Sequence, residues 1–136
     1  MKKTLFLSVG ALCALGAAAI FSTNAAEEKP KLTIKKVMQI AHKAPEGTDP
    51  LCKRAAEGKA TQEELAKLVE FYTAMMSDTP PRGDAASWKA KSTALLKATV
   101  ALQKGEEGAL PAFKAAVDCK GCHAPHKPQP PAKNKK

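Results

Sequence analysis

The 136-residue chain is poor in aromatic residues and has no segment in which apolar and polar positions alternate as in a β-strand. Aromatic residues make up 4% of the chain, with one tryptophan and one tyrosine. No basic stretch is interleaved with aromatic residues, which argues against nucleic-acid binding. A domain this short and this poor in large side chains can build only a modest core, to which another buried group would add area. These absences favour an all-α fold with a small core.

Long apolar runs are also absent, apart from one at the N-terminus. Lys2 and Lys3 precede an apolar run from Leu5 to Phe21, and small residues follow around Ala26. This order is typical of a cleaved signal peptide, which we assign to residues 1–26. The alternative, an uncleaved anchor, is less favoured because the run is shorter than the roughly 20 residues of a spanning helix. We therefore expect a periplasmic protein without stable membrane insertion.

The mature chain is basic. Removal of residues 1–26 leaves 110 residues, enough for one domain, and lowers the formal net charge from +9 to +7 because Lys2 and Lys3 are lost. A positive surface of this size steers encounters with acidic partners. Residues 128–136, rich in proline and lysine, predict a flexible basic tail that follows a helical domain of residues 27–127.

Helical periodicity and turn signals divide this domain into four helical blocks. Asp49-Pro50 predicts an N-cap and a proline at the first helical position, so the first block is interrupted near Pro45. Thr61 and Glu64 have the spacing of a capping box, and Asp84 is a further N-cap candidate. Pro111 is expected to open the last helix. The expected blocks are 32–57, with its interruption, 61–78, 84–104 and 111–126.

Cys119-Lys120-Gly121-Cys122-His123 matches C-x-x-C-H, the attachment signature of a c-type haem. On a helix, residues three and four apart share a face, so both thiols and the imidazole can project to one side. The thiols can then form thioethers with the two vinyl groups of one haem, while His123 binds the iron as the proximal ligand. The sequence therefore predicts one covalent haem c.

Three other uses of this cysteine pair are less favoured. A structural zinc site needs four ligands, so one residue would have to complete the set that the motif begins. The candidates are His42, Cys52 and His126, and none of them has the usual spacing from the motif. A redox pair of the thioredoxin type requires a βαβ context, and a disulfide between cysteines three apart would constrain very little chain. Cys52 itself is interpreted as a small core residue.

The order of these features resembles the class II c-type cytochromes, the cytochrome c-prime group and its low-spin relatives. The resemblance covers roughly Leu32 to Lys127 and includes Val37-Met38, Gly58-Lys59, Trp88, Phe113 and Lys127, with the haem motif on the last helix. It implies an antiparallel four-helix bundle that holds the haem between helices, with the first helix interrupted here. A homodimer is a further expectation from the resemblance.

The resemblance also supplies candidates for the distal side of the iron. It implies Met38 as the sixth ligand, the alternative being a methionine that only packs in the core. His42 lies four residues later on the same helix face, so it is the alternative ligand. Trp88 and Phe113 are candidates to pack against the porphyrin, with ordinary core positions as the alternative, whereas Met75 and Met76 are interpreted as packing residues. His126 is too close in sequence to His123 to reach the opposite face of the haem.

The functional expectation is a periplasmic electron carrier with one haem that exchanges electrons with acidic redox proteins. Thioether and imidazole ligands together raise the reduction potential, which suits electron transfer. The sequence shows no acid–base pair typical of a catalytic site, so an enzyme is not expected. The alternative is a five-coordinate protein that binds nitric oxide or carbon monoxide, as in the cytochrome c-prime group.

Overall fold

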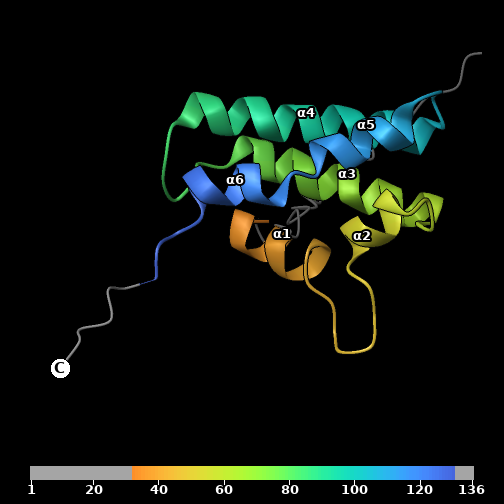
Figure 1. Cartoon of the computed structure of the whole chain (residues 1–136), viewed down its shortest axis with the longest axis horizontal. Helices are drawn as coiled ribbons and strands as arrows, with labels where there is room; N and C mark the ends of the chain where they lie inside the picture. The colour runs from red at the N-terminus through yellow and green to blue at the C-terminus, as the bar shows by residue number, and fades with distance from the viewer. Residues whose placement is uncertain (1–31, 131–136) are drawn as a thin grey trace, which may run out of the picture.

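The computed structural model describes residues 32–130, which form six α-helices and no strand (Figure 1). The all-α prediction is therefore confirmed for this part of the chain. The predicted signal peptide and most of the predicted tail lie outside the described residues. None of the helices within 32–130 is both long and apolar enough to span a bilayer.

Two long antiparallel helices, α3 (Gln62–Ser77) and α4 (Ala85–Lys104), lie side by side and form the largest helix pair of the fold (Figure 1). Their ends follow the sequence signals. The Thr61 hydroxyl accepts from the Glu64 N–H while the Glu64 carboxylate accepts from the Thr61 N–H, which confirms the capping box. Asp84 caps α4 as predicted, and Gly105, at φ 69°, ends it.

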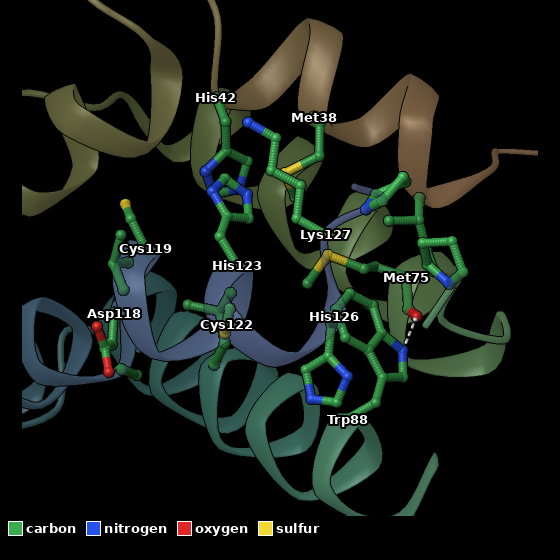
Figure 2. A pocket seen from close by; sticks show the side chains of 16 residues that line it. Met38, His42, Met75, Trp88, Asp118, Cys119, Cys122, His123, His126 and Lys127 are labelled. Atoms are coloured by element: carbon green, nitrogen blue, oxygen red, sulfur yellow. Dashed lines mark hydrogen bonds between the residues drawn. The ribbon is translucent and has the colours of Figure 1, made fainter. Parts of the chain in front are cut away.

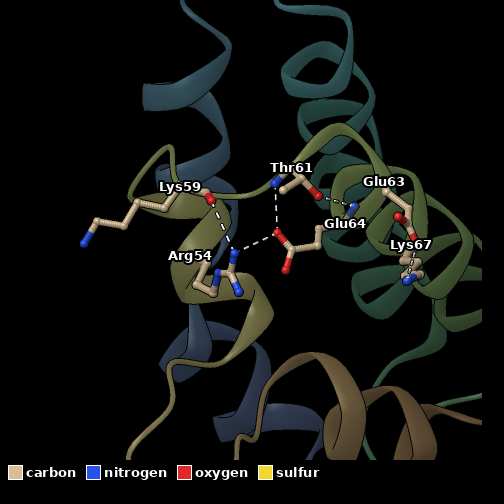
Figure 3. Close-up of polar contacts among 6 residues, drawn as sticks. All are labelled: Arg54, Lys59, Thr61, Glu63, Glu64 and Lys67. Carbon is tan, nitrogen blue, oxygen red and sulfur yellow. Dashed lines mark hydrogen bonds and ion pairs between the residues drawn. The ribbon is translucent and has the colours of Figure 1, made fainter.

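Two short helices, α1 (Ile34–Ala41) and α2 (Leu51–Ala56), pack on α3 and are separated by residues 42–50, so the interruption is confirmed. The predicted cap of α2 is wrong. Pro50 itself is the N-cap, and the Asp49 carboxylate instead pairs with the Lys53 ammonium at 2.6 Å. The Arg54 guanidinium lies 3.0 Å from the Glu64 carboxylate, which joins α2 to the start of α3 (Figure 3).

The last helical block is two helices, α5 (Ala109–Ala116) and α6 (Cys119–His126), rather than one. The predicted start at Pro111 is also wrong, because α5 begins two residues earlier. The helix breaks because Val117 leaves the helical region at ψ 61° and the Asp118 side chain then caps a new helix. α5 packs mainly on α4, whereas α6 packs on α4 alone among the described helices.

The core lies between α1, α3, α4 and α5. On α3 four side chains of one face are buried, Leu65, Leu68, Tyr72 and Met75. The corresponding face of α4 buries Trp88, Leu95 and Thr99, while Leu96 and Leu102 are only partly covered. α1 contributes Val37 and Ala41, and α5 contributes Phe113. Because α6 lies outside this core, its inner face can border a cavity.

Candidate functional site

A cavity with about 630 Å³ of empty space, including its open mouth, separates α1 from α6. α1 and α6 do not pack directly, since none of their Cα atoms lie within 8 Å of one another. The lining of the cavity is largely apolar, and outside α6 it is formed chiefly by Ile34, Met38, His42, Met75, Trp88 and Leu95 (Figure 2).

The three motif side chains of α6 all line this cavity. Cys119 and His123 are exposed and Cys122 is half-buried, and both cysteines are free thiols. Burial raises the pKa of the Cys122 thiol, although the Lys91 charge opposes this effect. The spacing of the motif thus has the expected geometric result, in which two thiols and an imidazole border one cavity.

Local chemistry explains why α6 begins at Cys119. The Gly121 N–H donates to the Asp118 carboxylate at 2.8 Å, which satisfies one of the free donors at the start of the helix. A β-carbon at Gly121 would collide with that same carboxylate, so the glycine within the motif leaves room for the cap. Asp118 and Gly121 together therefore define where the motif helix begins.

Met38 and His42 line the opposite side of the cavity, so the structure brings both candidate distal ligands to the same place. Figure 2 shows the His42 and His123 side chains directed toward each other, with their rings overlapping in this view. Burial, with a smaller contribution from the nearby His123 charge, lowers the pKa of His42 to about 4. The His42 imidazole is therefore neutral near pH 7. Its Nε2 lies 3.2 Å from the Tyr72 hydroxyl.

The two aromatic candidates have different positions. Trp88 lines the cavity, and its indole N–H donates to the Met75 carbonyl at 3.2 Å. Phe113 is fully buried in the core and is not among the residues that line the cavity. Met75, which the sequence suggested only as packing, does line it. No local signal distinguishes Met75 from its neighbour Met76, because the difference depends on which face of α3 borders the cavity.

The end of α6 is held by the turn between α3 and α4. The Arg82 guanidinium donates to the Ala124 carbonyl, and Nδ1 of His126 lies 3.1 Å from the Arg82 carbonyl oxygen. The His126 ring is 2% exposed and packs edge-on against Trp88, with ring centroids 5.4 Å apart. The sequence gave His126 no ligand role, and it did not predict these contacts with Arg82 and Trp88.

The donor set of the cavity suits a haem. Two thiols and an imidazole lie on one short helix, a thioether and a second imidazole lie opposite, and the space between them is bordered by apolar side chains. In residues 32–130 no three histidine, cysteine or acidic side chains are grouped as metal ligands. A haem iron needs no such group, because the porphyrin supplies its equatorial ligands.

Comparisons with known proteins identify no relative of this chain. No family model matches the chain, and neither a curated protein nor a solved structure is significantly similar to it.

Proposed function

We propose that this protein is a periplasmic monohaem c-type cytochrome that carries electrons between other redox proteins. The observation that carries the proposal is the cavity between α1 and α6. Both thiols and the imidazole of the C-x-x-C-H motif border it on one side, and Met38 and His42 border it on the other. A flat cofactor with two attachment points and two axial positions requires this arrangement of donors.

Each residue has a definite role in this proposal. Cys119 and Cys122 hold the haem through thioethers, His123 is the proximal iron ligand, and Met38 is the distal ligand. The bound haem supplies an iron that cycles between the ferric and ferrous states. Ile34, Met75 and Trp88 exclude water from the cavity, which lowers the local dielectric constant and favours a soft thioether ligand at the iron.

The arrangement of helices supports a bundle like that of the class II c-type cytochromes. In this interpretation the antiparallel bundle has four helical segments. The first is α1 together with α2, the second is α3, the third is α4, and the fourth is α5 together with α6. Short connections between consecutive segments favour antiparallel neighbours, as with the turn between α3 and α4. The split between α5 and α6 then turns the motif helix toward α1, so that the haem lies between the two.

The proposed location and partners rest on the sequence. Residues 1–26 direct export, and the mature net charge of +7 favours acidic redox proteins as donor and acceptor. The proposal includes no catalytic turnover and no nucleic-acid partner. It leaves the tail, residues 128–136, outside the haem-binding domain.

The proposal is tested by the mass and the absorption spectrum of the exported protein, produced in a host that matures c-type cytochromes. We expect the mass of one haem added to the mature polypeptide and a low-spin ferric spectrum. Cys119→Ser and Cys122→Ser should each weaken or abolish attachment, whereas the matched variant Cys52→Ser should retain it. Haem that acidified organic solvent extracts from the wild type would contradict covalent attachment, and a high-spin wild type would favour the gas-binding alternative.

A further inference from the structure

Met38 and His42 compete for one position. They lie one helical turn apart, Met38 within α1 and His42 at its C-terminal cap, and both line the cavity opposite α6. An imidazole is a strong ligand for haem iron and would give a lower potential than a thioether. A carrier that uses Met38 therefore needs a structural reason for His42 to stay off the iron.

Tyr72 supplies such a reason. Its side chain is fully buried on α3, and its hydroxyl lies 3.2 Å from Nε2 of His42. The two rings are tilted by 53° with centroids 5.7 Å apart, so the phenol meets the edge of the imidazole. Burial also raises the pKa of Tyr72, which keeps the phenol protonated and able to donate.

Whether His42 can bind iron depends on which of its two ring nitrogens is hydrogen-bonded to Tyr72. In either tautomer of the neutral ring, the hydrogen bond to Tyr72 occupies Nε2, either as acceptor or as donor. The other nitrogen, Nδ1, lies next to the β-carbon, where the backbone of the same residue hinders approach to a flat macrocycle. His42 can bind iron through its accessible nitrogen only after this hydrogen bond breaks.

We propose that Tyr72 is a positioning residue that decides which side chain binds the iron, holding His42 by its Nε2 so that Met38 takes the sixth position. This inference rests on the proposed function, because it presumes a haem attached at Cys119 and Cys122. Tyr72 is not an iron ligand in this role, and it acts only through His42. It thereby keeps the reduction potential at the higher value of a methionine-ligated haem.

The test is the Tyr72→Phe variant, which removes the hydroxyl and retains the buried ring. We expect loss of the near-infrared band that sulfur–iron charge transfer gives in the ferric wild type. The variant should stay low-spin, and its reduction potential should fall because histidine replaces methionine. The double variant Tyr72→Phe/His42→Ala should regain the band and the higher potential, because no imidazole remains to compete.

Thr99→Val is the matched control, since it removes another fully buried hydroxyl, one that bonds only within α4 at 2.7 Å to Leu95. It should leave the band and the potential unchanged. A measurement on the wild-type protein tests the same inference without any substitution. In the diamagnetic ferrous protein, nitrogen NMR should show His42 with a hydrogen-bonded Nε2 and without iron bound.

The outcomes separate this inference from the proposed function. A Tyr72→Phe protein that keeps the wild-type band and potential overturns the inference and leaves the electron carrier intact. A wild type already ligated by two histidines does the same. A wild type without covalent haem overturns the proposed function, and the inference with it.

Discussion

Gly83 leaves no room for a side chain beneath His126. A β-carbon at Gly83 would lie 2.8 Å from Nδ1 of His126 and 2.6 Å from the Pro125 carbonyl oxygen. Gly83 also has φ +81°, a conformation that residues with a β-carbon rarely adopt. The turn between α3 and α4 can therefore press directly on the end of the motif helix only with glycine at this position.

Gly83→Ala should destabilise the protein more than Gly47→Ala does. Both glycines have φ near +80°, but a β-carbon at Gly47 meets nothing within 4 Å. Gly47→Ala should cost only the backbone strain, about 1 kcal/mol, whereas Gly83→Ala adds a collision with α6 and should cost about 2–3 kcal/mol. Urea unfolding of both variants measures the difference. Equal losses of unfolding free energy in the two variants would show that α6 moves to accommodate the β-carbon with no loss of stability.

Met38→Ala should convert the ferric protein from low-spin to high-spin and allow carbon monoxide to bind the ferrous form. The reason is that truncation removes the thioether while Tyr72 still holds His42. Absorption spectra with and without carbon monoxide measure both changes. Met76→Ala is the matched control, because Met76 is a half-buried methionine that does not line the cavity. His42→Ala should leave the spectrum nearly unchanged, and opening of the site by that variant instead would identify histidine as the ligand.

Stability should fall with acid because of His42. The fold lowers the pKa of His42 from 6.5 to about 4, mainly by burial, so the unfolded chain binds more protons between these values. The free energy of unfolding should therefore decrease as the pH falls through this window, by about 2 kcal/mol between pH 7 and pH 5. Denaturant titrations at both pH values measure it. The same titrations of His42→Gln give the change in unfolding free energy without this imidazole, so the difference between the two proteins is the contribution of His42. An identical pH dependence in the two proteins would contradict the prediction.

Electron exchange with an acidic redox protein should slow as salt is added. The mature charge of +7 accelerates encounters at low ionic strength, and screening shortens to about 8 Å near physiological ionic strength. Stopped-flow rates across a salt series measure the effect. Truncation after Lys127 then separates the contribution of the tail from that of the folded domain. Rates that do not change with salt would contradict the prediction that the positive charge accelerates these encounters.

The sequence predicted the helix ends that depend only on near neighbours. The capping box of Thr61 and Glu64, the cap at Asp84 and the stop at Gly105 each involve residues within one turn, so local pattern was sufficient. Pro111 was misleading because proline fits any position of the first helical turn, and α5 begins at Ala109. The break at Val117 carries no glycine or proline, so no local signal marks it.

The sequence predicted the part of the candidate site that is formed by residues close together in the chain. It did not predict the contacts between residues of different helices. The spacing of Cys119, Cys122 and His123 predicted a shared face, and all three border one cavity. The contacts of Tyr72 with His42 and of His126 with Arg82 span 30 and 44 positions along the chain. Such contacts depend on which helix faces oppose one another, which periodicity alone does not determine. The haem and its distal ligand stay predictions.

Among the described helices α6 packs only on α4, and this has a consequence for how the protein is assembled. The helices α1 to α5 contact one another without help from α6, so the body of the domain can form while the last segment is still extended. An extended Cys119–His123 segment is accessible to enzymes that join thiols to haem, whereas a segment already packed is not. In the proposed cytochrome, the order of the chain would therefore separate formation of the core from the later packing of α6 beside the haem, with Arg82 and Gly83 holding the end of α6 in place.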